Sequence, residues 1–207
     1  NIRRNSLMAE VKTTEEYDGA SWSGGGTATS VGGEFAALAG TQTDAMAVGG
    51  YTGSYHGNAE SYNGTSWSSE AAFPSSQNQH AGSAVGGGQT DYIVAGGTPA
   101  DQSIDIDGTY HYNGSSWSSG GTLSNNRHVG CMNGTTGDAI FSQGNRLSDS
   151  ELYDGGTWST GPAPSSGRYS PSNSVACSGS ANGVVFGGGT GSANSTGTTL
   201  IQEFDEA

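Results

Sequence analysis

The sequence predicts an all-β fold, and within that class a β-propeller of four-stranded blades, with four blades as the preferred number. A motif of an aromatic residue, Asp-Gly or Asn-Gly, two small residues and Trp recurs along the chain, and its tryptophans are 45, 50 and 41 residues apart. Short apolar runs that end in glycine or a glycine-like turn precede the motif. Periods of roughly 40–50 residues are typical of propellers and of helical arrays. Helical periodicity is absent, so a propeller is favoured.

The motif is interpreted as a tight hairpin between two strands. Asp-Gly and Asn-Gly tolerate the positive φ angles that short hairpin turns require. The aromatic residue therefore ends one strand and the Trp begins the next. A fifth copy of the first strand, Gln202–Asp205, contains Phe204 in place of Tyr. The four complete pairs are Tyr17 and Trp22, Tyr62 and Trp67, Tyr112 and Trp117, and Tyr153 and Trp158.

Two further strands precede each hairpin after the first. The nearer one is a short apolar run, as expected of a buried strand. The one before it is made of small residues, which suit the narrow axis where blades converge. The apolar runs are Ala45–Val48, Tyr92–Ala95, Ala139–Ser142 and Gly183–Phe186, and the small-residue runs are Phe35–Ala39, Ala81–Val85, Val129–Met132 and Ser174–Cys177.

These strands predict an N-terminal arm followed by one propeller domain. Closing the ring with strands from both ends removes exposed sheet edges. Five copies of the Tyr-type strand for four blades leave one strand to spare, so five blades or an incomplete propeller stay as alternatives. The expected parts are the arm at 1–12 and the propeller at 13–207, with repeats at about 33–70, 80–120, 127–161 and 172–206, the last closed by an outer strand from 13–24.

The Gly-Gly doublet after an apolar strand, followed by Tyr and then Trp, resembles the kelch repeat over nearly the whole chain. The polar sequences Tyr62–Ser68 and Ala39–Ala45 resemble repeat proteins regarded as virion structural components of marine cyanobacterial phages. This resemblance implies propeller blades, a location in the virion, and other virion proteins or copies of the chain as partners. Galactose oxidase shares the kelch propeller, but its copper ligands have no matching motif here.

Composition narrows the possible partners. The formal net charge is −13, so a basic face for nucleic acid is not expected. No stretch is long and apolar enough for insertion into a membrane. The chain is strongly polar and contains 37 Gly, a composition that can indicate disorder. The regular recurrence of aromatic residues favours a repeat fold instead. No cofactor is expected.

Binding residues are expected on the loops that differ between repeats, because loops held by a rigid scaffold carry most binding functions. Asp105 and Asp107 alternate along a strand and could hold Ca²⁺ with Asp101, but the full calcium-loop spacing is absent. A solvated acidic loop is the preferred interpretation, and no catalytic, cofactor or metal residue is assigned. The candidate loop residues are Tyr51, Tyr55, His56, Asp101, Asp105 and Asp107.

The recurring residues are interpreted as structural. The Trp and Tyr of each motif are expected to pack between blades, since a periodic position serves the repeat first. Glu15, Glu60 and Glu151 stand two places before the Tyr and are expected to face solvent or the backbone of a neighbouring blade. Cys131 and Cys177 are expected to be two buried thiols, with a disulfide as the alternative.

The lack of a catalytic pattern favours a non-enzymatic protein. The preferred hypothesis is a structural or host-attachment protein of a phage virion, such as part of a tail fibre, with the propeller as an assembly or receptor-facing module. A host surface glycan or receptor is then a further expected partner. One alternative is a secreted or cell-surface carbohydrate-binding propeller. The other is an enzyme on a propeller scaffold, which needs convergent polar residues in the central channel.

Overall fold

A computed structural model describes residues 12–31, 37–50, 54–74, 77–78, 81–83, 88–99, 105–167, 172–174, 180, 182–186, 189 and 201–205. Every regular element in these residues is a β-strand, which confirms the all-β prediction. Three of the sheets have four strands, and all of the strand pairs are antiparallel.

The four-stranded sheets follow the predicted repeats. In order along the chain they are β3 (Ala37–Thr41), β4 (Asp44–Val48), β5 (Ala59–Tyr62) and β6 (Trp67–Ser69); β8 (Ala81–Ser83), β9 (Tyr92–Ala95), β11 (Thr109–Tyr112) and β12 (Trp117–Ser119); and β13 (Cys131–Thr135), β14 (Asp138–Ser142), β15 (Ser150–Tyr153) and β16 (Trp158–Thr160).

Three smaller sheets complete the described chain. They are β17 (Ser172–Ser174), β18 (Asn182–Phe186) and β19 (Ile201–Asp205); the hairpin of β1 (Thr13–Tyr17) and β2 (Trp22–Thr27); and the short pair of β7 (Gln77–Asn78) and β10 (Thr98–Pro99), which the sequence did not predict.

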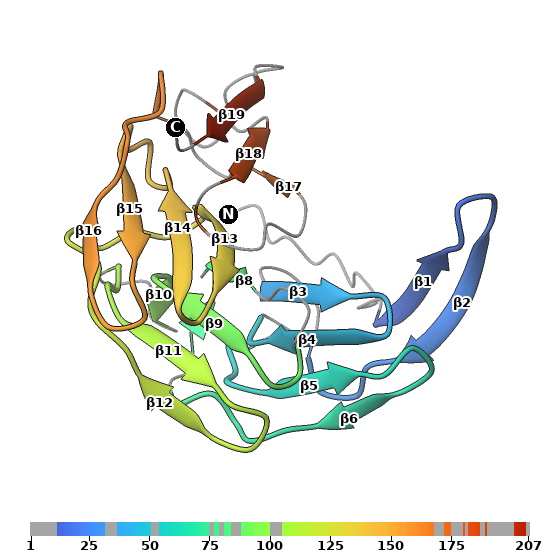
Figure 1. The fold of residues 1–207 in the computed structure, drawn as a ribbon. Coiled ribbons are helices and arrows are strands. Elements are labelled where there is room, and N and C mark those ends of the chain that lie inside the picture. Colours follow the sequence, from blue (N-terminus) through green and yellow to red (C-terminus); the bar gives the residue numbers. More distant parts are fainter. Residues whose placement is uncertain are drawn as a thin grey trace, which may run out of the picture.

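The larger sheets follow one another along an arc in chain order, from the β1–β2 hairpin to the β17–β19 sheet (Figure 1). The first strand of each sheet lies next to the first strand of the following sheet: β3 by β8, β8 by β13, and β13 by β17. Each sheet therefore begins on the inner side of the arc and extends outward, strand by strand.

The hairpin turns have the chemistry that the motif predicts. In the first, Asp18 Oδ1 accepts hydrogen bonds from the backbone N–H groups of Ala20 and Ser21, at 2.8 and 2.7 Å. Asn63, Asn113 and Asp154 make the same two bonds in the other turns. The glycine that follows has a positive φ, between 87° and 97°, in all four turns: Gly19, Gly64, Gly114 and Gly155. As a result, Tyr pairs directly with Trp in all four hairpins.

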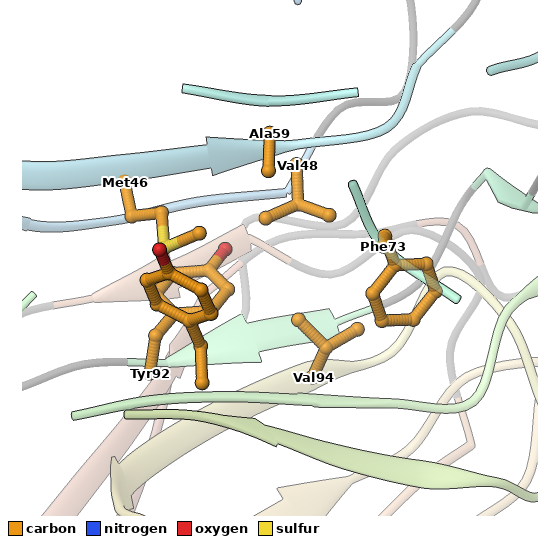
Figure 2. Packing of buried hydrophobic residues seen from close by; sticks show 7 residues of the cluster. Met46, Val48, Ala59, Phe73, Tyr92 and Val94 are labelled. Atoms are coloured by element: carbon orange, nitrogen blue, oxygen red, sulfur yellow. The ribbon is translucent and has the colours of Figure 1, made fainter. Parts of the chain in front are cut away.

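The core lies between successive sheets and is formed chiefly by their second strands. Met46 and Val48 of β4 pack against Tyr92 and Val94 of β9 (Figure 2). The opposite face of β9 packs Ile93 and Ala95 against the third four-stranded sheet, where Met132 and Phe141 are buried. A strand buried on both faces cannot alternate apolar with polar residues, which explains the continuous apolar runs.

The N-terminal hairpin pairs as its motif predicts, but among the described strands it forms a sheet of its own. The segment 13–24 was expected to give an outer strand to the sheet at 172–206. In the described residues β2 pairs with β1, and β19 pairs with β18 alone. The cause is local, because the tight turn at Asp18 brings Trp22 directly opposite Tyr17 and holds the two strands together. Phe204 lies on β19 in the third-strand position, opposite Gly183.

Candidate functional site

The tyrosine and tryptophan of each hairpin join consecutive sheets. The Tyr112 hydroxyl donates to Glu70 of the preceding sheet at 2.6 Å, and that of Tyr62 donates to Glu16 of β1. The indole Nε1 groups of Trp67 and Trp158 donate to Thr14 and Thr109, and that of Trp117 to the carbonyl of Ala71, at 2.7–2.8 Å. In these repeats the aromatic side chains therefore lie between consecutive sheets.

The first hairpin is the exception. The side chains of Tyr17 and Trp22 are 50% and 68% exposed, whereas Tyr62, Tyr112 and Tyr153 are buried. With Leu38, which is 63% exposed, they are the large apolar side chains that the described residues leave open to solvent. A groove of about 420 Å³ lies between β1 and the sheet of β3–β6, and its lining includes Tyr17, Leu38 and Ala39.

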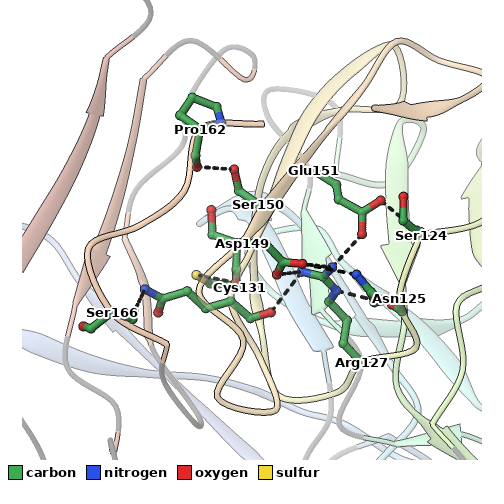
Figure 3. A network of polar contacts seen from close by, with 11 residues as sticks. Ser124, Asn125, Arg127, Cys131, Asp149, Ser150, Glu151, Pro162 and Ser166 are labelled. Carbon is green, nitrogen blue, oxygen red and sulfur yellow. Dashed lines mark hydrogen bonds and ion pairs between the residues drawn. The ribbon is translucent and has the colours of Figure 1, made fainter. Parts of the chain in front are cut away.

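A buried network of charges surrounds Arg127, in the segment between β12 and β13. Its guanidinium is fully buried and lies 2.9 Å from Asp149 and 2.6 Å from Glu151 (Figure 3). It also donates to the carbonyls of Gln143 and Asn125, both at 3.4 Å, and its carbon lies 5.4 Å from the centre of the Phe141 ring. We call Arg127, Asp149, Glu151 and Gln143 the Arg127 cluster.

The cluster ties three loops together. The backbone N–H of Arg127 donates to the carbonyl of Ile106, and its carbonyl accepts from Gly97. The backbone thus holds the loops of the second four-stranded sheet, while the side chain holds the loop before β15 in the third. Since the guanidinium has both carboxylates beside it, the arrangement holds the loops together.

The backbone around the cluster is strained. Gln143 has a φ of 62° and occupies the position at which Gly49 and Gly96, with φ of 68° and 66°, end the second strands of the other sheets. Positive φ is costly for side chains other than glycine and is typical of positions that the surrounding structure constrains. Other described non-glycine residues with positive φ lie in the same part of the chain: Val129, Asn145 and Arg146.

Two of the predicted loop residues lie beside this cluster. The Asp105 carboxylate is 2.8 Å from His128 Nδ1, and its other oxygen accepts from the Asn145 amide. The backbone carbonyl of Asp107 accepts a hydrogen bond from the N–H of Leu123, in the segment between β12 and β13, at 2.9 Å. The structure therefore places Asp105 in a pair with His128 and not with Asp107.

The remaining candidates stay apart. Tyr55 and His56 are both half-buried in the segment before β5. Tyr51 and Asp101 lie outside the described residues. Across the described ranges, no three His, Cys, Asp or Glu side chains converge as a metal site requires.

Two of the three recurring glutamates, Glu60 and Glu151, bind the backbone of a neighbouring repeat, as one of the two expectations proposed, whereas Glu15 is exposed to solvent, as the other proposed. Glu60 is fully buried and accepts from the N–H groups of Thr29, Ser30 and Val31 at 3.1–3.3 Å. Burial alone raises the pKa of Glu60, but the hydrogen bonds from Thr29, Val31 and Ser30 together lower it below its ordinary value. Glu151 accepts from the Ser124 N–H in the same way, at 2.7 Å.

Sequence reasoning missed Arg127. A signal was present, since Arg127 is one of only 6 basic residues in the chain and Gln143 replaces a repeated glycine in the same repeat. Cys131 is buried, as expected, and its thiol donates to the Ser142 carbonyl at 3.4 Å. Cys177 lies outside the described residues.

Comparisons with known proteins give no family. No protein-family model matches the chain, and no curated protein matches it. Among the residues that the structure describes there is no long apolar helix of the kind that crosses a membrane.

Proposed function

We propose that the chain is a non-enzymatic protein of a phage particle, structural or host-attaching, which uses a four-bladed kelch-like propeller as an assembly or receptor-facing module. The observation that carries the proposal is the seating of each four-stranded sheet on the one before it through the same Tyr and Trp positions. Nearest-neighbour packing of this kind builds a rigid scaffold from repeats.

Two arrangements at the ends of the arc support a closed ring. The β1–β2 hairpin receives Tyr62 and Trp67 just as an outer pair of strands receives them in the other sheets. The β17–β19 sheet continues the arc beyond β13 and has three strands. Together the two ends contain five strands, enough for one further blade with one strand to spare, which supports the count of four.

The assignment to a particle rests on the resemblance of Tyr62–Ser68 and Ala39–Ala45 to virion repeat proteins. A net charge of −13 favours solubility over contact with nucleic acid. The buried charges of the Arg127 cluster join loops, a use that suits a scaffold.

The test is the protein composition of purified particles. Quantitative mass spectrometry of particles banded in a density gradient is expected to find the chain at a fixed number of copies per particle. Immunogold labelling then locates it on the particle. Recovery from host cytosol with none in particles would contradict the proposal.

A glycan-binding propeller at a cell surface is the second candidate, and the half-buried Tyr55 and His56 favour it as loop residues that a rigid sheet positions. This candidate predicts binding on a glycan array that Tyr55→Ala abolishes while Tyr17→Ala leaves it intact. A folded protein that binds no glycan would exclude it.

A further inference from the structure

The groove beside β1 is the surface from which one strand of a blade is missing. In each four-stranded sheet the third strand pairs with a second strand on one side and with a fourth strand on the other. Among the described strands, β1 has β2 as its partner and no second strand on its other edge. The groove lies between β1 and the next sheet, and both sides of it contribute to the lining.

The repeat indicates what should cover the groove. Leu38 faces Ala47 across β3 and β4, just as Met132 faces Phe141 across β13 and β14. Met132 is 1% exposed because Ile93 and Ala95, on the second strand of the preceding sheet, belong to the same buried cluster. Leu38 is 63% exposed. The missing cover for Leu38 is therefore a short apolar second strand.

The β17–β19 sheet contains a second strand of this kind. β18 has the apolar sequence Val184-Val185-Phe186, and its sheet has no fourth strand among the described residues. The other second strands, β4, β9 and β14, belong to sheets that already have four.

The registers are compatible. Gly183 lies opposite Phe204 of β19, the position at which Ala45 and Ala139 lie opposite Tyr62 and Tyr153. By the same register β1 would place Tyr17 opposite Gly183 and Glu15 opposite Val185. β1 also has the glutamate of the repeat, Glu15, where β19 has Gln202, and β1 is followed by the Trp strand that a complete sheet requires.

We propose that β18 fills the groove beside β1, and that β1 takes the edge of β18 which β19 holds in the structure. The inference rests on the proposed ring and says which strand closes it. The closed arrangement has the sheet order β17, β18, β1, β2, and it releases β19 (Ile201–Asp205). Covering the groove removes Leu38 from solvent. The chain thus has two arrangements that differ in which strand occupies one edge.

Cysteine pairs trap each arrangement in the full chain. Residues directly opposite on antiparallel strands have Cβ atoms close enough for a disulfide. In a background of Cys131→Ala and Cys177→Ala, the pair Glu15→Cys with Val185→Cys reports the closed arrangement. The pair Val185→Cys with Gln202→Cys reports the one in the structure. Glu15→Cys with Val184→Cys is the matched control, because a one-residue offset places the two side chains on opposite faces.

The proposal predicts that both reporting pairs oxidise within one chain, seen as monomers on a non-reducing gel, while the control pair stays at least tenfold less oxidised. Gln202→Pro, which weakens β19 as a strand, is expected to raise the yield of the 15–185 disulfide severalfold. Acrylamide quenching of Trp22, read as the signal lost in Trp22→Phe, is expected to fall once that disulfide forms.

Two results would overturn the proposal. In one, the 185–202 disulfide forms fully and the 15–185 disulfide does not, even with Gln202→Pro. In the other, the 15–185 disulfide forms only between chains, which makes a second copy the occupant of the groove. Neither result changes the copy number of the protein in particles, so failure of the exchange is distinguishable from failure of the proposed function.

Discussion

At the scale of single residues, charged groups are buried at the loops between the described sheets. Arg127 has no exposed side-chain surface and is paired with Glu151, whose side chain is 4% exposed, and with Asp149, whose side chain is 36% exposed. Removing one member of a buried pair leaves the other charge without compensation, which costs far more than losing a surface pair. The two carboxylates should therefore differ in importance although both touch the same guanidinium.

Glu151→Gln is expected to lower the free energy of unfolding by about 3–5 kcal/mol, because Arg127 keeps a buried charge that Asp149 alone must balance. Asp149→Asn is the matched control and should cost about 1 kcal/mol, as for a partly exposed pair. Urea unfolding followed by tryptophan fluorescence measures both. Equal losses in the two variants would show that burial does not set the strength of these pairs.

Glu60 gives a pH dependence of known sign. Its pKa in the folded protein lies below the ordinary value of 4.5, since the hydrogen bonds from the backbone at Thr29 to Val31 outweigh burial. Such a group stabilises the folded state fully above the unfolded pKa and loses this contribution as pH falls through the folded pKa. The difference in unfolding free energy between wild type and Glu60→Gln should be constant above about pH 5 and shrink below pH 4.5. A difference that stays constant down to pH 2 would contradict this account of Glu60.

At the scale of elements, the side chain two places before the Tyr of each third strand suits the linker that precedes its sheet. Glu60 and Glu151 face linkers that offer backbone N–H groups at Thr29 and Ser124, seven residues after a Trp. At the corresponding place the next linker has Pro74, which has no N–H to donate. The glutamate position there is Tyr110, whose ring packs edge-on against Phe73 at 4.9 Å. Where the linker has no N–H donor, an aromatic contact therefore replaces the hydrogen bond between glutamate and backbone.

The hydroxyl of Tyr112 tests how much one hydrogen bond between consecutive sheets contributes to the free energy of unfolding. Burial and the neighbouring Glu70 carboxylate raise the pKa of Tyr112 to about 12, so the phenol stays protonated and donates to Glu70 at neutral pH. Tyr112→Phe is expected to cost about 1.5–3 kcal/mol, as for hydrogen bonds to charged groups. Tyr153→Phe is the control and should cost less, because the Tyr153 hydroxyl meets a backbone N–H at 3.4 Å. Urea unfolding measures both variants, and a larger loss of unfolding free energy in Tyr153→Phe than in Tyr112→Phe would contradict this order.

The sequence predicts the elements well and their connections less well. The Tyr and Trp positions, the hairpin turns and the apolar second strands follow from periodicity and turn chemistry, and the structure contains them. The Arg127 cluster was missed because Gln143, Asp149 and Glu151 lie 16 to 24 residues from Arg127 along the chain, and Arg127 itself stands on a linker between sheets. The β1–β2 hairpin was predicted, but its place beside the sheet of residues 172–206 is not found among the described strands. Both β1 and β19 have the pattern of a third strand, and a pattern cannot say which edge a strand occupies.

At the scale of the whole molecule, the described sheets form a series in which each contacts its neighbours through first strands, apolar second strands and aromatic seats. Stability in such a series is a sum of terms within and between repeats. The two ends of the series are the places where this pattern is incomplete. How the β1–β2 hairpin and the β17–β19 sheet pack therefore determines whether the series closes into a ring.

A crystal structure of the full chain is the most direct test of the central claim that the repeats form one ring. The account predicts four sheets around a single axis, with first strands innermost and with β1–β2 next to β18 in the closing sheet. Two layers of sheet packed face to face, as in a β-sandwich, with the Tyr and Trp side chains of successive repeats out of contact, would contradict it.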